Sequence, residues 1–305
     1  MRRQAEVGCD VEHDAVLIGL CVNGRDQPLP IGTIEGVVDR IDRDTKSTGR
    51  VAINLDKEKE AAAMLKMVSA KEKYGFILKD GATQPVNELA QHKFDTGLFD
   101  DVSKANTKNY CTEIFEICGL QYDGEPYLLD NHADKNFVWD IVRSKPIIGL
   151  NTGCGDRWTT RLWSIENWIE LAKMIEKAGY TPLLLGGSQE HDRNLAIQEG
   201  SGACYLGNYP LQQFINLIDQ CDLVVTQVTM GMHLTLGLGK KIVLMNNIFN
   251  SHEFDLFNKG AIVQPPKTCK CFYRGSCVDG NSCMETLSPE VVMGHVESVL
   301  NGPSI

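Results

Sequence analysis

The second half of the chain alternates short apolar runs with segments of helical period, and this alternation constrains the fold more than any other feature. Each apolar run has the length of a buried strand and is bounded by turn-forming residues. The predicted strands are residues 146–150, 181–185, 203–206, 222–226 and 241–245. The predicted helices are one between Ser164 and Gly179, residues 190–199, 210–220 and 232–238, and a last one opening at Ser288-Pro289-Glu290. Strands and helices at this spacing indicate a parallel sheet covered on both faces, so we expect a Rossmann-like α/β domain.

The first half is less regular and is predicted to form a smaller α/β domain. Its predicted strands are residues 15–22 and 50–55, and its predicted helices are residues 57–70, 86–98 and 107–118. A polar stretch at 130–140 is predicted to link the halves, which gives expected domains of 1–140 and 141–305.

Charge and hydropathy exclude two classes of protein. The net charge of -10 over 305 residues disfavours a general binder of polyanions, so we expect no nucleic-acid partner. The longest uncharged run, residues 223–239, is too short and too polar to span a bilayer. Acidic residues come early in residues 1–14, before any apolar segment, so we expect no secretory signal. These patterns favour a cytoplasmic protein.

Three loops leave predicted strands where parallel α/β sheets bind ligands. The first, residues 151–163, offers glycines, hydroxyl groups, two arginines and a following helix start. These groups suit a phosphate, which backbone N–H groups and arginine attract. The alternative is a structural loop with solvated arginines.

The second and third loops carry weaker signals. Gly186-Gly187-Ser188 leads to Glu190, and its two glycines suit either a ligand lying against the backbone or an ordinary tight turn. In the third loop Thr229 lies where a helix begins and His233 lies one turn later. A single histidine is as consistent with a satisfied core side chain as with a ligand contact.

The three loops, in this order, resemble the donor domain of glycosyltransferase family 9, the ADP-heptose:lipopolysaccharide heptosyltransferases and their relatives. The motifs that carry the resemblance are Ile148-Gly-Leu-Asn-Thr-Gly153, Trp158-Thr-Thr-Arg-Leu-Trp163, Leu183-Leu-Leu-Gly-Gly-Ser188, the stretch from Cys221 to Leu234, and a cysteine-rich tail. The resemblance covers residues 145–300 closely and residues 50–130 loosely.

The resemblance implies a GT-B architecture, in which two Rossmann-like domains face each other across a cleft. The C-terminal domain would hold the nucleotide sugar and the N-terminal domain the acceptor. The donor-binding residues that it implies are Thr152, Gly153, Cys154 and Gly155 in the phosphate loop, Arg161 in place of the family's usual lysine, Gly187, Ser188 and Glu190 around the nucleoside, and Thr229, Met232 and His233 at a helix start.

The sequence also departs from the family pattern. Val228 replaces an aspartate that usually precedes the threonine, and Met230-Gly231 replaces a glycine-proline pair. The glycine-aspartate segment that carries the family's general base is not found, so the start of the first domain is interpreted as missing or replaced. Asp56, at the end of the predicted strand 50–55, is the candidate for the general base by position. Its alternative role is to cap the following helix.

Four of the eleven cysteines, Cys269, Cys271, Cys277 and Cys283, crowd near the C-terminus. Four thiols in a short span can bind zinc, but the spacing has no Cys-x-x-Cys pair. Disulfides or free thiols are the favoured interpretation.

The resemblance implies an inverting, metal-independent glycosyltransferase. It would pass a heptose-like sugar from an ADP-linked donor to a lipopolysaccharide-core or other glycan acceptor, without a cofactor, in the cytoplasm or at the inner face of the inner membrane. We expect weak activity because the usual base is not found. The alternatives are a catalytically impaired nucleotide-sugar-binding protein and a GT-B-like sugar-nucleotide epimerase.

Overall fold

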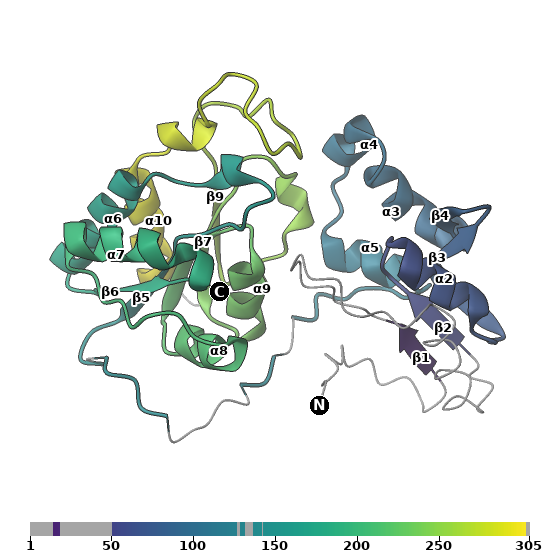
Figure 1. The fold of residues 1–305 in the computed structure, drawn as a ribbon, viewed down its shortest axis with the longest axis horizontal. Coiled ribbons are helices and arrows are strands. Elements are labelled where there is room, and N and C mark those ends of the chain that lie inside the picture. Colours follow the sequence, from purple (N-terminus) through teal and green to yellow (C-terminus); the bar gives the residue numbers. More distant parts are fainter. Residues whose placement is uncertain (1–14, 19–50, 127–128, 132–136, 142, 303–305) are drawn as a thin grey trace. The chain divides into compact units, whose positions relative to one another are not determined.

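A computed structural model describes residues 15–18, 51–126, 129–131, 137–141 and 143–302 (Figure 1). The chain forms two compact units, Met1–Asp123 and Gly124–Ile305, and each is described here by itself. This division comes earlier than the boundary expected near residue 140. Of the strand predicted at 15–22, residues 15–18 form β1, and the remainder lies outside the described residues.

The first unit contains a mixed sheet in the order β1-β2-β3-β4. Its strands are β1 (Ala15–Ile18), β2 (Val51–Asn54), β3 (Glu72–Lys79) and β4 (Ala82–Pro85). The first three are parallel, and β4 pairs with β3 antiparallel. The β3–β4 hairpin was not predicted. Its Asp80-Gly81 turn is a recognisable hairpin signal, since such turns need residues that tolerate positive φ, and here the φ values are 51° and 77°.

The helices of the first unit are shorter than predicted. They are α2 (Lys59–Met67), η1 (Glu88–Ala90), α3 (Gln91–Thr96), α4 (Asp100–Ala105) and α5 (Tyr110–Ile117). The single helix predicted at 86–98 is wrong, because this stretch divides into η1 and α3. Small buried clusters, such as Phe76 with Ala90 and Ile117, hold these helices together.

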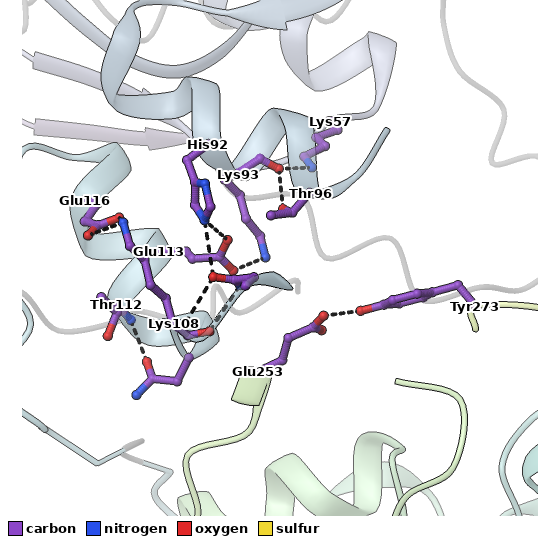
Figure 2. A network of polar contacts seen from close by, with 12 residues as sticks. Lys57, His92, Lys93, Thr96, Lys108, Thr112, Glu113, Glu116, Glu253 and Tyr273 are labelled. Carbon is purple, nitrogen blue, oxygen red and sulfur yellow. Dashed lines mark hydrogen bonds and ion pairs between the residues drawn. The ribbon is translucent and has the colours of Figure 1, made fainter. Parts of the chain in front are cut away.

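A buried ion pair joins α3 to α5 (Figure 2). Glu113 is 1% exposed, and its Oε2 accepts a hydrogen bond of 2.5 Å from Nζ of Lys93. The other oxygen, Oε1, lies 3.7 Å from Nε2 of His92. Lys57, which follows β2, donates to the backbone oxygen of Lys93 (2.6 Å) and so ties α3 to the carboxyl end of the strand. Lysine donors therefore connect the sheet, α3 and α5.

The second unit has a fully parallel sheet in the order β6-β5-β7-β8-β9. Its strands are β5 (Ile147–Asn151), β6 (Thr181–Leu185), β7 (Leu223–Gln227), β8 (Lys241–Met245) and β9 (Gly260–Val263). The edge strand β9 was not predicted. The strand predicted at 203–206 is wrong: Cys204 makes an isolated bridge to Leu183, bonding through its backbone to Pro182 and Leu184.

Helices cover both faces of this sheet, as predicted (Figure 1). The α-helices are α6 (Ile165–Lys177), α7 (His191–Ser201), α8 (Leu211–Asp219), α9 (Met230–Gly237) and α10 (Pro289–Asn301), and the short 3-10 helices are η2 (Thr159–Arg161), η3 (Ser188–Glu190), η4 (Ser251–Glu253) and η5 (Cys283–Thr286). Among the residues the structure describes, no helix is both long and apolar enough to cross a bilayer.

The pleat of the strands sorts their side chains between the two layers. Ile148, Leu150 and Val225 pack with α6, α7 and α10 in the larger cluster. The neighbouring positions Ile147 and Val224 pack with α8 on the opposite face. Every strand side chain in these clusters is nearly fully buried, which explains the continuous apolar runs in the sequence.

Candidate functional site

Three loops leave the carboxyl ends of adjacent strands β6, β5 and β7 in the second unit. We call the segment after β5, residues 152–163, the donor loop, after the role that the resemblance implies for it. Because parallel strands end at the same edge of a sheet, the loops predicted from the sequence meet at one place.

Asn151, the last residue of β5, connects this edge to α9. Its Nδ2 donates to Oγ1 of Thr226 (2.9 Å) and to Oγ1 of Thr229 (3.1 Å). Thr229 is the N-cap of α9 and accepts from the backbone N–H of Gly231 (3.1 Å). The position predicted for Thr229 at a helix start is therefore confirmed, and its hydroxyl is fixed between β5, β7 and α9.

Gln227 makes a second connection that sequence reasoning missed. Its side chain is fully buried at the end of β7, and its amide fits with the nitrogen donating to the backbone oxygens of Gly153 and Asn151 (3.1 Å each). A glutamine ending an otherwise apolar buried strand was the available signal.

Arg161 holds the donor loop and the third loop together. Its Nη1 donates to the backbone oxygen of Val228, its Nη2 to that of Cys154 and its Nε to that of Trp158 (3.3 Å). The guanidinium group also lies 5.4 Å from the ring centre of Phe249. Arg161 is only 7% exposed, and this burial lowers its pKa from the ordinary arginine value.

Within the described part of the chain, no carboxylate lies within ion-pair distance of Arg161. A buried guanidinium is costly unless it is paired, and here its hydrogen-bond acceptors are backbone carbonyl oxygens. The arrangement leaves a positive charge at the junction of two loops for an anion to neutralise.

Arg193, in the first turn of α7, is a second cation near the donor loop that the sequence analysis missed. It donates through Nη2 to the backbone oxygen of Trp163, while its Nε is buried without a hydrogen-bond partner among the described residues. The pKa of Arg193 is lowered by burial, which outweighs the opposite effect of the nearby Cys154, Glu166 and Glu190. The signal was an arginine just after a glycine loop, in a segment interpreted only as a polar helix.

Glu190 lies between the second loop and the donor loop. Its Oε2 accepts from the backbone N–H of Gly187 (2.9 Å), and its side chain packs directly on Gly153. A Cβ atom on Gly153 would lie 2.0 Å from Oε1 of Glu190. Gly187 and the neighbouring Ser188 are exposed.

Other predicted site residues lie in different surroundings. Thr152 is fully buried and donates to Oδ1 of Asn194 (2.5 Å), whereas Gly155 is exposed. Met232 is 2% exposed and packs with Leu236 in the core beneath α9. Its side chain therefore positions the helix. His233, the next residue, is exposed.

Cys154 is buried in the donor loop with 6% of its surface exposed. Burial raises the pKa of its thiol, while the neighbouring Arg161 and Arg193 lower it in part. The net result is a protonated thiol at neutral pH, which suits packing.

The remaining candidates lie elsewhere. Asp56 belongs to the first unit, where its Oδ1 accepts from the backbone N–H of Glu58 (2.9 Å) just before α2. The described cysteines, including those of the tail, are free thiols. Within the described residues there is no cluster of three or more side chains able to hold a metal ion.

Comparison with known proteins identifies the family. The sequence model of glycosyltransferase family 9 (heptosyltransferase) matches residues 48–255. None of the curated proteins compared with the chain matches it.

Solved structures share the fold at low sequence identity. The E. coli ADP-heptose lipopolysaccharide heptosyltransferase II matches with 17% identity and a TM-score of 0.59, covering 92% of this chain and 84% of that one. A family 9 glycosyl transferase from Veillonella parvula matches with 14% identity and a TM-score of 0.64, covering 88% and 78%. E. coli heptosyltransferase WaaC, solved with ADP-2-deoxy-2-fluoro heptose, matches with 14% identity and a TM-score of 0.52, covering 87% and 77%.

These matches confirm the fold class, an α/β protein of the GT-B type, and the resemblance noted in the loop motifs. The matched segment includes β5, β6 and β7 and every loop of the candidate site. The chain belongs to glycosyltransferase family 9, the heptosyltransferase family.

Proposed function

We propose that this chain transfers a heptose-like sugar from an ADP-linked donor to a glycan acceptor of the lipopolysaccharide-core type. The reaction would proceed with inversion and without a metal or other cofactor. The observation that carries the proposal is Arg161, a buried cation at the junction of two loops with no carboxylate partner among the described residues. Proteins with similar folds include an ADP-heptose lipopolysaccharide heptosyltransferase and a heptosyltransferase solved with an ADP-heptose analogue.

The hydrogen bonds of Arg161 support a role beside the donor's diphosphate. A guanidinium group has five N–H donors, and backbone oxygens engage three groups, Nε, Nη1 and Nη2, leaving further N–H donors for a ligand. Negative charge grows on the diphosphate as the sugar leaves. A fixed cation there stabilises the transition state more than the ground state.

The rest of the proposed donor site surrounds this cation. Residues 152–155 would lie along the phosphates, and Glu190, which accepts from Gly187 and packs on Gly153, would bind the ribose hydroxyls. Ser188, Thr229 and His233 would complete the site, with Met232 positioning the helix that carries the last two.

Asp56 is the proposed general base, because it follows β2 at the carboxyl end of a parallel strand. One of its carboxylate oxygens is already engaged by the backbone of Glu58. We therefore expect slow transfer, since a base of this kind contributes about 10²–10⁴-fold to the rate.

The test is thermal unfolding of the chain with ADP, ADP-sugars and AMP. A ligand at 100 times its dissociation constant adds about 2.7 kcal/mol to the free energy of unfolding. ADP should stabilise the protein more than AMP because the second phosphate reaches Arg161. Arg161→Ala should remove most of this difference.

Arg157→Ala is the matched control, because Arg157 lies on the same loop but is exposed and stacks on Trp158. It should retain most of the preference for ADP. Equal stabilisation by ADP and AMP, before and after Arg161→Ala, would exclude the proposed donor site. Consumption of an ADP-sugar without any acceptor would favour an epimerase or hydrolase instead.

A further inference from the structure

The cysteine loop, residues 269–283, plays no part in the proposed chemistry, yet it carries four free thiols. It lies between β9 and α10 and includes the first residue of η5. Its thiols face each other in pairs. Sγ of Cys271 lies 3.6 Å from Sγ of Cys277. Cys269 lies near Cys283, which contributes to the raised pKa of the Cys269 thiol.

The backbone between Cys271 and Cys277 folds into a tight loop that brings the first pair together. Tyr273 adopts a positive φ of 49°, which is unusual for a residue other than glycine. Sγ of Cys271 also accepts from the backbone N–H of Val278 (3.2 Å). A disulfide has sulfur atoms about 2.05 Å apart. Because the two sulfur atoms are already 3.6 Å apart, only a small side-chain movement is needed to form the bond.

Each pair consists of one buried thiol, Cys271 or Cys283, and one partly exposed thiol, Cys277 or Cys269. Cys271 is 2% exposed, but its partner Cys277 is partly exposed and can meet a reagent in solution. Burial raises the pKa of Cys269 to about 12, so that thiol is a poor nucleophile. The pKa of Cys277 is also raised: a backbone hydrogen bond from Asp279 lowers it, but desolvation and the Cys271 thiol outweigh this effect.

The segment between Cys271 and Cys277 supports the donor loop directly. Oγ1 of Thr160 donates to the backbone oxygen of Arg274 (3.0 Å). A Cβ atom on Gly275 would lie 3.0 Å from the backbone oxygen of Arg157. The ring of Tyr273 packs edge-on against the ring of Phe249, with 5.0 Å between the ring centres. The Tyr273 hydroxyl donates to a carboxylate oxygen of Glu253 (Figure 2).

Phe249 also contacts the guanidinium of Arg161, so the cysteine loop lies one layer behind the proposed phosphate-binding cation. Residues 272–276 therefore contact Thr160, which precedes Arg161 in the sequence, and Phe249, whose ring lies against the Arg161 guanidinium.

We propose that Cys271 and Cys277 form a reversible disulfide by exchange with a small-molecule disulfide, and that this bond tightens donor binding by fixing the segment behind the donor loop. One cysteine thiolate attacks the small disulfide and releases one small thiol. The second cysteine attacks the mixed disulfide and releases the other. The protein loses two electrons and two protons, and the oxidant becomes two thiols.

The experiment treats the reduced full-length chain with oxidised glutathione and maps its disulfides by mass spectrometry without reduction. Wild type should lose two hydrogen atoms in mass and yield a peptide linked through Cys271 and Cys277. Because the pKa of the accessible thiol, Cys277, is raised, the reaction should be faster at alkaline than at neutral pH. In Cys271→Ser the second step is impossible, so glutathione should remain attached to Cys277.

Two variants keep this test sharp. Cys221→Ser removes a fully buried thiol elsewhere in the unit and should behave as wild type. Cys269→Ser with Cys283→Ser should still form the Cys271–Cys277 bond. Persistent glutathione on wild-type Cys277 would overturn the proposal, as would a bond between any other pair. One zinc ion per freshly purified chain, lost in Cys277→Ser with Cys283→Ser, would also overturn it, because the thiols would then be metal ligands.

The effect on donor binding rests on the proposed function and is measured separately, with ADP as the probe. Oxidised wild type should bind ADP about 3- to 10-fold more tightly than reduced wild type, because a pre-organised loop loses less entropy on binding. Cys271→Ser with Cys277→Ser, treated in the same way, should show no change. A mapped disulfide with unchanged ADP affinity would refute the coupling alone. Failure of reduced protein to bind ADP would refute the proposed donor site and the coupling, but not the disulfide.

Discussion

At the scale of single residues, the candidate site depends on close approaches that leave no room for added atoms. A Cβ atom on Gly153 would lie 2.0 Å from Oε1 of Glu190. Gly187, in the neighbouring loop, is different, because its Cβ would meet the same carboxylate at an ordinary 3.5 Å. Comparing substitutions at the two glycines therefore distinguishes a steric clash with Glu190 from the general effect of replacing glycine.

Gly153→Ala should lower the free energy of unfolding by roughly 1–3 kcal/mol, the usual cost of overpacking. Gly187→Ala should change it by less than about 0.5 kcal/mol. Gly153→Ala combined with Glu190→Ala should be more stable than the sum of the two single changes predicts, because the obstructing side chain is gone. Urea unfolding measures all four variants. Strict additivity would mean that Glu190 does not occupy the space above Gly153.

The candidate site residues that the sequence predicts are those whose chemistry is visible in one segment. Arg161 and Thr229 stand in motifs, and the structure places both at the edge where the loops meet. Gln227 and Arg193 were not predicted because their hydrogen-bond partners lie on strands and loops that are distant in the sequence. Met232 was expected to contact the donor, but it lies on the inward face of α9, which an apolar helix does not reveal by its pattern.

At the scale of elements, two serines that look alike in sequence begin α6 and α10. Ser164 accepts from the backbone N–H of Asn167 (3.1 Å) and so caps α6. Ser288 makes no capping bond to the backbone of α10, which instead begins with a proline whose fixed φ suits a first helical turn. The same residue type should therefore contribute differently to the two helices.

Ser164→Ala should lower the free energy of unfolding by about 1 kcal/mol, since it leaves a backbone N–H of α6 without its partner. Ser288→Ala should cost clearly less. Thermal or urea unfolding of the two variants decides this, and equal losses would show that the hydroxyl of Ser164 has no special role.

Elements were predictable where the pattern was strong and local. The buried strands β5, β6, β7 and β8 read as uninterrupted apolar runs, and all four were found within one or two residues. The edge strand β9 was missed because it has four residues and opens with Gly260, whose Cβ would collide with the backbone of Ile242. In β3, charged ends and Gly75 at a φ of 92° concealed a strand.

At the scale of the whole molecule, the two units allow the proposed donor and acceptor functions to be tested one at a time. The proposed donor residues all lie in Gly124–Ile305, and the proposed base Asp56 lies in Met1–Asp123. A change at Asp56 should therefore affect the rate of sugar transfer without affecting the affinity for ADP.

Asp56→Asn retains the side-chain oxygen that accepts from Glu58, so the start of α2 should be preserved. Transfer to a lipopolysaccharide-core acceptor should fall, by at most the roughly 10²–10⁴-fold that an effective base contributes, while the dissociation constant for ADP stays unchanged. Asp100→Asn, an exposed change in the same unit, is the control and should leave both quantities as in wild type. Unaltered transfer by Asp56→Asn would assign the base to another residue.

The position of α10 along the chain has a consequence for synthesis of the protein. This helix buries Val292, Met293 and Val296 against the layer that also contains Val225 and Val243, yet it comes after every strand of the sheet. Until it emerges from the ribosome, part of that apolar layer faces water, and exposed surface of this kind attracts chaperones and favours aggregation. The second unit can therefore bury this layer completely only after α10 has been synthesised.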